Sequence, residues 1–266
     1  MKYPKISIVI PFYEGYEFLF ETISSCLNQD FPGEIEIIII DDCSSQSPNF
    51  IIEKFPEKKD CIKFVQNETN LGLMKTNNKA LSILSGEFVI FLGQDDILSP
   101  SHVRLMHYSA KKDGAAFVWC NSIVIDHQGK FIKKSLNDSL QKIKTFLAKF
   151  FITKSNFISS TGLMLDVSIL RKIGGFPEGF KNSGEWLLWI EIIFKYKISY
   201  TQSTKALYRR HENNLTNYID NEVLPKDVQF YYSYCKDLIH SKKRKQSNKF
   251  KILYFCLDIL WKLFKK

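Results

Sequence analysis

The stretch IEIIIIDDCSS, residues 35–45, decides the fold. Its isoleucines form a short apolar run of β-branched side chains, which favour strands. A run without polar alternation is typical of a strand that is buried on both faces. Two aspartates, Asp41 and Asp42, follow the run directly. The stretch therefore predicts a buried strand that ends in a pair of carboxylates.

The segments on either side repeat the pattern of a strand followed by a helix. Before it, the apolar run at residues 6–10 stops at Pro11, and apolar side chains then recur at helical spacing. After it, the pattern predicts a strand at residues 62–65, a helix at residues 72–84 and a strand at residues 88–92. Strands that alternate with helices imply a parallel sheet with right-handed crossovers. Ligands bind such sheets beyond the carboxyl ends of the strands.

The second half of the chain is less regular. The pattern there predicts two strands and two amphipathic helices: residues 117–124 and 162–165, a helix that contains Trp186 and Trp189, and a helix at residues 250–264. We interpret the two tryptophans as core packing. A soft boundary near Asn121 separates two halves that we expect to share one core. The sequence thus indicates one α/β domain followed by a helical tail.

Charge is concentrated at one end of the chain. The formal net charge is +9, and the segment from residue 241 to residue 266 holds nine Lys and Arg against one Asp, a local balance of +8. The remainder is therefore close to neutral. A protein that reads nucleic acid has basic residues spread over a binding surface. We therefore expect no nucleic-acid partner.

Six cysteines are scattered along the chain without a C-x-x-C pair. This spacing argues against a zinc site or a disulfide framework and indicates buried, reduced thiols. The N-terminal residues contain no signal peptide, and no run of about 18 apolar residues is present. We expect a cytoplasmic protein.

Two predicted strands end in acidic pairs, Asp41-Asp42 and Asp95-Asp96. Neighbouring carboxylates repel and lose solvation, so they need a cation or hydrogen-bond donors. A hard divalent ion takes a few carboxylate oxygens and completes its shell with phosphate oxygens. Alternatively, each pair caps the turn that follows it. Two such pairs on one parallel sheet favour a functional role.

Several motifs, in order, resemble the family 2 glycosyltransferases of the GT-A fold. The matching segments run through most of the chain: SIVIPFY at residues 7–13, IIIIDDCSS at 37–45, FLGQDDILSP at 91–100, GGFPE at 174–178, SGEWLLWIEI at 183–192 and YRRH at 208–211. Each motif alone is weak, but the ordered set is specific. The resemblance implies an α/β fold with a mostly parallel, Rossmann-like sheet flanked by helices. It also implies a nucleotide-sugar-binding half at residues 1–120, an acceptor-binding half at 121–218 and a basic, amphipathic helical tail at 219–266.

The resemblance also implies roles for individual residues. The donor would be bound by Pro11, Tyr13, Glu14, Asp42, Lys75, Asn78, Asp95 and Arg209. Tyr13 and Asp42 would lie near the nucleobase, and Asp95 near the ribose or the metal. A divalent cation, Mn²⁺ or Mg²⁺, would be held by Asp96, supported by Asp95 and His211. Taken alone, His211 would more often be an ordinary surface or core histidine, and its place in the YRRH segment makes a functional role equally plausible.

Some positions depart from the family pattern. The usual P-x-Y-N is Pro11-Phe12-Tyr13-Glu14, and the usual D-x-D-D is Gly93-Gln94-Asp95-Asp96. Asn77 replaces an arginine that would meet a phosphate, and Lys75 is its possible substitute. We expect the paired glycines Gly174 and Gly175 to supply a turn with positive φ.

Glu185 falls at the position of the family's catalytic base, where Asp is common. A carboxylate at a helix start is favoured by the backbone dipole, so Glu185 could also be only a first-turn charge. The resemblance implies inverting transfer of a sugar, with UDP as the expected nucleotide, to an acceptor hydroxyl in bacterial surface polysaccharide or lipid-linked glycan synthesis. Glu178 and Glu191 are weaker candidates for the base.

Two other interpretations remain at this point. IIIIDD is also similar to the strand and acidic pair of receiver domains, but a receiver is much shorter and carries the pair on its first strand. The second is a catalytically inactive GT-A subunit that only binds or scaffolds. In the tail, Phe250, Leu253, Leu257 and Trp261 share one helical face, and lysines lie on another. Such a helix suits an anionic membrane surface, or it packs on the domain.

Overall fold

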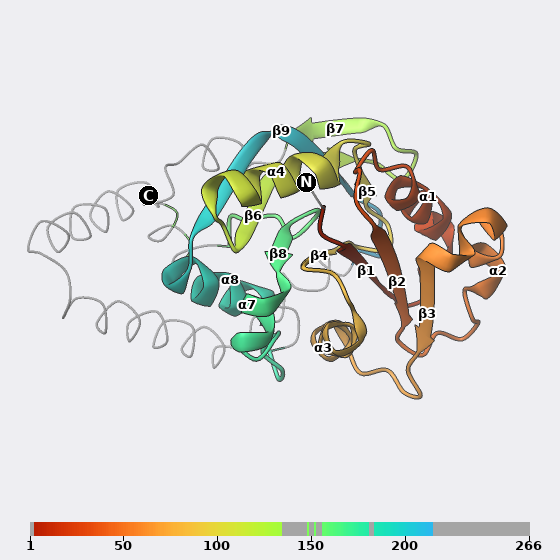
Figure 1. The fold of residues 1–266 in the computed structure, drawn as a ribbon. Coiled ribbons are helices and arrows are strands. Elements are labelled where there is room, and N and C mark those ends of the chain that lie inside the picture. The colour runs from red at the N-terminus through yellow and green to blue at the C-terminus, as the bar shows by residue number, and fades with distance from the viewer. Residues whose placement is uncertain (1–2, 135–147, 149–151, 153–155, 181–183, 215–266) are drawn as a thin grey trace, which may run out of the picture.

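The structure, a computed structural model, describes residues 3–134, 148, 152, 156–180 and 184–214. The chain begins with alternating strands and helices and then adds a less regular second half (Figure 1). The first half contains β1 (Ile6–Phe12), α1 (Tyr16–Leu27), β2 (Ile35–Asp41), α2 (Asn49–Ile52), the 3₁₀ helix η1 (Pro56–Cys61), β3 (Ile62–Gln66), α3 (Leu73–Ile83), β4 (Phe88–Phe91), β5 (Ile97–Leu98) and α4 (His102–Asp113). The second half contains β6 (Phe117–Ile125), β7 (Phe131–Lys134), β8 (Met164–Asp166), α7 (Val167–Lys172), α8 (Gly184–Lys195) and β9 (Ile198–Arg209).

The strands form one sheet in the order β3-β2-β1-β4-β8-β6-β9-β5, and β7 pairs with β6. The first four strands in this order are parallel to one another. β8 then runs antiparallel to both β4 and β6. The predicted fold class, a largely parallel sheet flanked by helices, is confirmed. β6 crosses residue 120, so the same sheet runs through both predicted halves.

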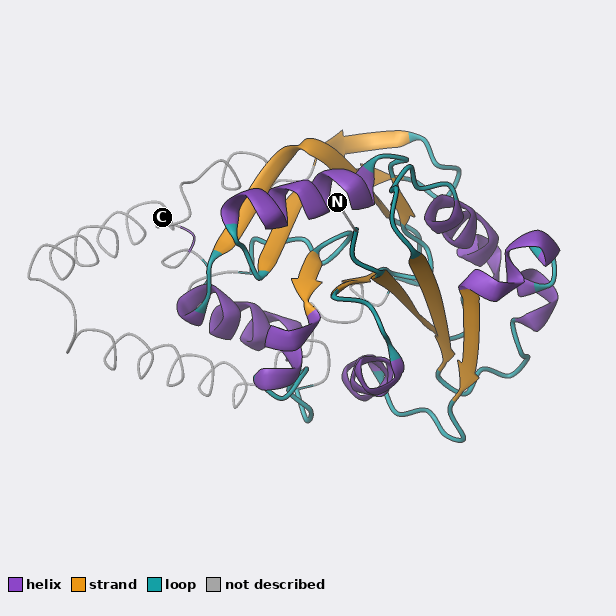
Figure 2. Cartoon of the chain, viewed as in Figure 1, coloured by secondary structure: helices purple, strands orange, loops and turns teal. Residues whose placement is uncertain are grey.

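Helices cover both faces of the sheet, and this explains the unbroken isoleucine run in β2. Side chains alternate between the faces of a strand. Ile37 and Ile39 pack in one buried cluster with α1 and α4, and Ile38 and Ile40 pack in a second cluster with α3, α7 and α8. Figure 2 shows the helices on the two sides of the strands. A strand with two covered faces must be apolar at every position, which is the pattern that the sequence displays.

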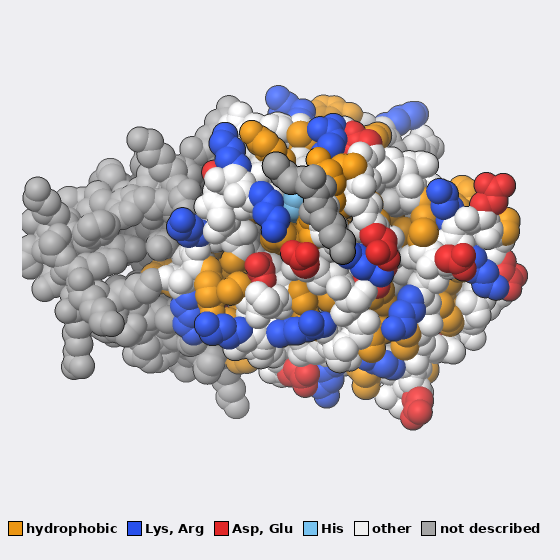
Figure 3. Space-filling model, in the orientation of Figure 1, with side chains coloured by type: hydrophobic (Ala, Val, Ile, Leu, Met, Phe, Trp, Pro, Cys, Tyr) orange, Lys and Arg blue, Asp and Glu red, His pale blue; other side chains and the backbone are white. Residues whose placement is uncertain are grey.

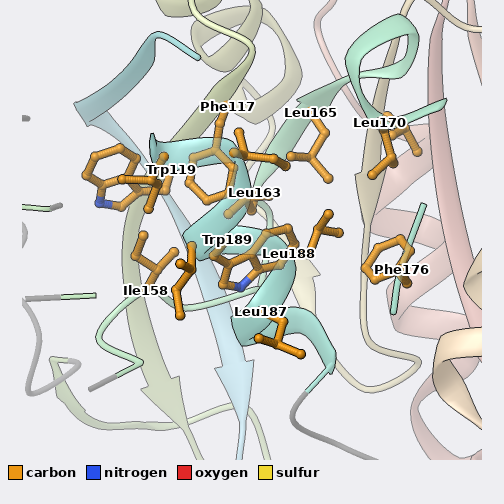
Figure 4. Packing of buried hydrophobic residues seen from close by; sticks show 14 of the residues in the cluster. Phe117, Trp119, Ile158, Leu163, Leu165, Leu170, Phe176, Leu187, Leu188 and Trp189 are labelled. Atoms are coloured by element: carbon orange, nitrogen blue, oxygen red, sulfur yellow. The ribbon is translucent and has the colours of Figure 1, made fainter. Parts of the chain in front are cut away.

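The cluster beneath the second half is built around aromatic side chains. Phe117 and Trp119 on β6 meet Trp189 on α8, and the rings of Phe117 and Trp189 are 5.2 Å apart at a steep angle (Figure 4). Trp189 is buried, so the prediction of core packing is correct for this residue. The indole nitrogen of Trp186 donates a hydrogen bond to the carbonyl of Ile152 (2.7 Å). This contact gives Trp186 a packing role as well.

The structure contains elements that the sequence pattern did not predict, and one predicted strand begins later in the chain than expected. The segment predicted as a strand at residues 162–165 begins as a turn, and β8 starts at Met164.

Cys26 and Cys120 are buried free thiols as expected, but the free thiols of Cys43 and Cys61 are exposed. Among the residues described, no helix is long and apolar enough to cross a bilayer. The predicted tail helix at residues 250–264 lies outside them.

The described part of the face shown in Figure 3 mixes basic, acidic and apolar side chains. The chain outside its last 26 residues has a net charge close to zero.

Candidate active site

Three adjacent parallel strands bring the predicted donor residues to one edge of the sheet. β1 lies between β2 and β4, so the segments that follow all three strands meet at the same edge. These segments carry Tyr13, Asp42 and Asp95. Ligands of open α/β sheets bind at such an edge because the strand order leaves a crevice there.

The loop after β1 is held by Gln94, a residue without an assigned role in the motifs. The Gln94 side chain accepts a hydrogen bond from the Tyr13 backbone nitrogen (2.7 Å) and donates one to the Tyr13 carbonyl (3.1 Å). A Cβ atom on Gly15 would lie 2.1 Å from the Gln94 amide nitrogen, so a side chain at residue 15 would displace this amide from Tyr13. The Tyr13 side chain is 50% exposed at this edge, where a planar base can stack.

Glu14 has a positive φ of 52°, and the loop that follows β2 holds its carboxylate. Its carboxylate accepts hydrogen bonds from the backbone nitrogen (2.6 Å) and hydroxyl (3.0 Å) of Ser45. The backbone hydrogen bond from Ser45 is the main cause that lowers the pKa of Glu14. Glu14 therefore ties the two loops together as a carboxylate. Pro11, before this loop, is half-buried within β1.

The first acidic pair is satisfied by protein donors. The Asp42 carboxylate is buried and accepts hydrogen bonds from the backbone nitrogens of Leu71 and Gly72, each at 2.8 Å, and from the Asn67 side chain at 2.7 Å. Asp41 likewise accepts a hydrogen bond from the backbone nitrogen of Ser44 (2.9 Å). Asp41 therefore caps the turn that follows it, as the capping alternative predicts, whereas the donors to Asp42 lie in a distant segment of the chain, at residues 67–72. Asp42 thereby fixes the start of α3.

The second acidic pair divides into a buried and a more accessible carboxylate. Asp96 is only 4% exposed and accepts hydrogen bonds from the Thr161 hydroxyl (2.8 Å) and the Arg209 backbone nitrogen (3.0 Å). Burial, followed by repulsion from Asp95, raises the pKa of Asp96 well above its usual value. Asp95 is partly exposed, and its Oδ2 lies 2.8 Å from Nε2 of His211 and 3.0 Å from the Asn214 amide nitrogen.

The glycine at position 93 accommodates this arrangement. A Cβ atom built on Gly93 would lie 2.9 Å from a carboxylate oxygen of Asp95 and 2.9 Å from one of Asp96. Both carboxylates therefore converge over the position where the usual family motif has a third one. A side chain at residue 93 would therefore displace these two carboxylates from their present positions.

The donor set at this strand end fits a divalent cation that is only partly held by protein. Asp95 and His211 place a carboxylate oxygen, the ligand type that suits Mn²⁺ and Mg²⁺, beside an imidazole nitrogen, which suits a transition-metal ion better than Mg²⁺. Both Asp96 oxygens instead face donors inside the protein. Within the described ranges no three His, Cys, Asp or Glu side chains cluster around one point. Oxygens from a donor diphosphate would be needed to complete the shell.

Arg209 is turned inward in this structure and does not face the edge. Its guanidinium is 1% exposed and donates hydrogen bonds to the carbonyls of Asp95 (3.0 Å) and His127 (3.0 Å), and it pairs with Glu21. The guanidinium also lies over the Phe18 ring, 4.6 Å from its centre. These contacts give Arg209 the task of fixing the strand end that carries Asp95.

Asn78 also holds a loop in this structure. Its amide forms a hydrogen-bonded pair with the backbone of Phe176, donating to the carbonyl (2.9 Å) and accepting from the nitrogen (2.8 Å). It also donates to the Glu178 carboxylate (2.9 Å). Gly174 and Gly175 in this loop have φ values of 89° and 81°, so the expectation of a positive-φ turn is confirmed. On the same helix, Asn77 is buried and Lys75 is exposed, so only Lys75 can reach an anion outside.

Glu185 lies in the first turn of α8. Burial raises the pKa of Glu185 to about 7, and a hydrogen bond from the Ser160 side chain opposes this rise. A carboxylate with such a pKa can both hold and release a proton near neutral pH. Ser160 and its neighbour Thr161, which contacts Asp96, were missed at the sequence level because the short hydroxyl run at residues 159–161 matches none of the motifs.

Known proteins resemble this chain in sequence and fold. The family model described as Glycosyl transferase family 2 matches residues 7–174. The chain is 30% identical over 207 residues to the GalNAc(5)-diNAcBac-PP-undecaprenol beta-1,3-glucosyltransferase of Campylobacter jejuni, covering 77% of this chain and 65% of that protein.

Two solved structures share the fold. The Staphylococcus aureus TarS structure in complex with UDP-GlcNAc has a TM-score of 0.71 and 22% identity, covering 90% of this chain and 66% of that one. The mannosyltransferase PcManGT from Pyrobaculum calidifontis, in complex with GDP-Man and Mn²⁺, has a TM-score of 0.59 and 12% identity, covering 97% and 80%. This chain thus spans about two thirds of the C. jejuni protein and of the crystallised TarS chain. With the family match over residues 7–174 and the strand-end carboxylates at the sheet edge, the chain belongs to glycosyltransferase family 2 and has the GT-A fold.

Proposed function

We propose that this chain transfers a sugar from a UDP-sugar to a hydroxyl of a lipid-linked saccharide, with inversion at the sugar carbon. The observation that carries the proposal is that Glu185, whose pKa is raised to about 7, is linked to the acidic pair Asp95-Asp96. The link runs through consecutive residues, since Ser160 contacts Glu185 and Thr161 contacts Asp96. A base and a leaving-group site are the two parts that inverting transfer requires.

Glu185 acts as the general base in this proposal. Its carboxylate takes the proton from the acceptor hydroxyl while that oxygen attacks the sugar carbon from the face opposite the leaving diphosphate. The sugar carbon develops oxocarbenium character as the bond to the diphosphate breaks. A single displacement of this kind inverts the configuration at that carbon.

Asp95 and His211 are the residues that would hold the divalent cation. When bound, the cation neutralises the charge that builds on the departing nucleoside diphosphate. The next residue, Asp96, accepts a hydrogen bond from the backbone nitrogen of Arg209. The Arg209 side chain donates a hydrogen bond to the carbonyl of Asp95. We assign the direct contact to Asp95 because it is the more exposed of the two carboxylates and lies beside the imidazole.

Tyr13 and Lys75 are the exposed side chains suited to the donor, for stacking on the base and for pairing with a phosphate. Pro11, Glu14, Asp42 and Asn78 shape the same edge through the hydrogen bonds of their loops. UDP is proposed as the nucleotide because the TarS structure binds UDP-GlcNAc in the same fold. A lipid-linked acceptor is proposed because the C. jejuni relative is named for an undecaprenol-linked one.

An inactive GT-A subunit is the second candidate function. Gly93 removes a carboxylate of the usual motif, and the carboxylates of Glu14 and Asp42 are already engaged by protein donors. Such a subunit would bind a nucleotide-sugar and still fail to transfer it. Binding and transfer must therefore be measured separately.

Donor selection is tested by isothermal titration calorimetry with UDP-, GDP- and dTDP-sugars, each with and without Mn²⁺. We expect a UDP-sugar to bind more tightly than the same sugar on GDP or dTDP, and to lose affinity when EDTA removes the cation. Tyr13→Ala should weaken the UDP-sugar by about 10-fold, since stacking on one base contributes about 1–3 kcal/mol. A protein that binds no nucleotide-sugar at all would contradict the proposal.

The tail at residues 219–266, outside the described residues, is proposed to contact an anionic membrane surface on the cytoplasmic side. Its apolar and lysine-rich sequence suits that surface and would bring the site close to a lipid-linked acceptor. In liposome flotation at low salt, the full chain should float with anionic vesicles more than with neutral ones. A chain that ends at His240 should remain at the bottom, and equal flotation of the two chains would contradict membrane contact through the tail.

A further inference from the structure

A tight turn precedes β8 and lies at the same sheet edge as the acidic pair. The backbone nitrogen of Leu163 donates to the carbonyl of Ser160 (3.3 Å), and Gly162 has a φ of 74°. A glycine with positive φ at the third position is what a type II β-turn requires. β8 is antiparallel to β4, so the residues that lead into β8 lie where β4 ends, next to the strand end that carries Asp95 and Asp96.

The turn is fixed by His102, the first residue of α4. The ring nitrogen Nε2 of His102 lies 2.6 Å from the carbonyl of Gly162, and Nδ1 lies 3.2 Å from the Thr204 hydroxyl. Burial lowers the pKa of His102 to about 4, so the ring is neutral and donates through Nε2. A Cβ atom on Gly162 would lie 2.7 Å from both His102 and Ala206, which excludes any other residue there.

Two consecutive hydroxyls of this turn contact two different carboxylates of the site. The Thr161 hydroxyl donates to Asp96 (2.8 Å), in the segment that follows β4. The Ser160 side chain is hydrogen-bonded to Glu185, in the first turn of α8. The chain thus joins the carboxylate proposed as the base to the acidic pair through a single peptide unit. The segments that carry these carboxylates lie 89 residues apart in the sequence, from Asp96 to Glu185.

We propose that the turn formed by Ser160, Thr161, Gly162 and Leu163 is a positioning element that sets Glu185 against the acidic pair, with Ser160 orienting the base. The inference rests on the proposed function. Neither hydroxyl contacts a reacting atom. The Ser160 hydroxyl binds one side of the Glu185 carboxylate and so leaves the remaining oxygen lone pairs for the acceptor proton. In the same way, the Thr161 hydroxyl donates a hydrogen bond that orients the carboxylate of Asp96, the residue that follows Asp95.

The two hydroxyls should have separable effects. A hydrogen bond to a carboxylate favours its ionised form, so its loss raises the pKa of Glu185 further. Ser160→Ala should therefore move the acid limb of kcat/KM to higher pH by about one unit and lower kcat at pH 7 by about 5-fold. The KM for the UDP-sugar should stay near that of the parent. Thr161→Val should instead raise the Mn²⁺ concentration needed for half-maximal rate, by about 10-fold, without moving the acid limb.

The experiment measures UDP release across pH and Mn²⁺ concentration, using whichever of UDP-glucose and UDP-N-acetylglucosamine the parent turns over. Ser160→Thr keeps a hydroxyl and should restore most of the rate, and Ser159→Ala, at the adjacent serine, is the matched control that should behave as the parent. Thermal unfolding checks that each variant is folded. ¹³C NMR titration of the Glu185 side-chain carboxyl in Ser160→Ala measures the pKa change without reference to turnover.

The outcomes distinguish this inference from the proposed function. A parent that releases no UDP, or a Glu185→Gln protein that is as active as the parent, overturns the function and this inference together. If the parent is active and Glu185→Gln is not, an unchanged pH profile and an unchanged Glu185 titration in Ser160→Ala overturn the positioning role alone. Three results together support the positioning role. The acid limb of kcat/KM shifts in Ser160→Ala, Ser160→Thr restores the rate, and the Mn²⁺ requirement changes only in Thr161→Val.

Discussion

Glu185→Gln is expected to lose about 10²–10⁴-fold in transfer rate, the range typical for removal of a general base. Glutamine keeps the size and most hydrogen bonds of the side chain but cannot take a proton. Donor and cation affinity should stay close to the parent values, because the proposed contacts to the donor and the cation come from other residues, chiefly Tyr13, Asp95 and His211. Glu185→Asp should keep part of the rate, since the shorter carboxylate remains a base set back by one methylene.

The same residue predicts the pH dependence of the parent. Burial disfavours the charged form and raises the pKa of Glu185 to about 7. Below that pH the side chain is protonated and cannot accept the acceptor proton, so kcat/KM should rise with pH and level off above about 7. The residual kcat/KM of Glu185→Gln should not show this rise with pH. A parental rate for Glu185→Gln would mean that the base lies elsewhere, and the exposed Glu178 would be the next residue to test.

Asp95→Asn is expected to produce the second large loss. The change removes the charge that lies beside His211 and so removes the stronger of the two proposed cation ligands. Binding of UDP should become insensitive to Mn²⁺, and turnover should fall by about 10²-fold or more, because charge on the leaving diphosphate is no longer neutralised. Calorimetry with and without Mn²⁺ measures the first effect, and UDP release measures the second.

Asp96→Asn is the matched comparison for Asp95→Asn. Asp96 is buried and accepts from Thr161 and from the Arg209 backbone nitrogen, so its replacement disturbs the position of the site. Loss of a residue that supports a ligand typically costs about 10–100-fold. We therefore expect Asp96→Asn to keep a Mn²⁺ response that Asp95→Asn lacks. An Asp95→Asn protein with the parent's Mn²⁺ dependence would contradict the assignment and would return the metal contact to Asp96.

The core of the fold could be predicted because short stretches of sequence are enough to identify its buried strands. An unbroken isoleucine run such as that of β2 has one good explanation, a strand covered on both faces, and the carboxylates at its end mark the open edge. β9 was missed as a strand because its residues Ile198–Arg209 mix polar and apolar side chains without a clear period. α4 was missed as well, since its first turn carries no acidic residue and Ser101, at its N-cap, makes no capping hydrogen bond with its side chain.

The site was predictable in its members and less so in their tasks. The sequence shows that Arg209, Asn78 and Asp42 stand at family positions, but a motif does not tell whether a polar side chain faces a ligand or its own backbone. In the structure all three hold loops through hydrogen bonds to main-chain groups. The Ser160–Thr161 link was beyond the sequence, because it depends on an antiparallel strand that enters between β4 and β6.

The most direct test of the account is glycosyl transfer by the parent protein in Mn²⁺, from UDP-glucose or UDP-N-acetylglucosamine to a synthetic undecaprenyl-diphosphate-linked saccharide. The product is analysed for linkage configuration by NMR. Inverting transfer from an α-linked UDP-sugar predicts a β-glycoside whose formation is lost in Glu185→Gln. Tight binding of a UDP-sugar without any transfer would identify the chain as an inactive binding subunit, and an α-linked product would contradict the single displacement with Glu185 as its base.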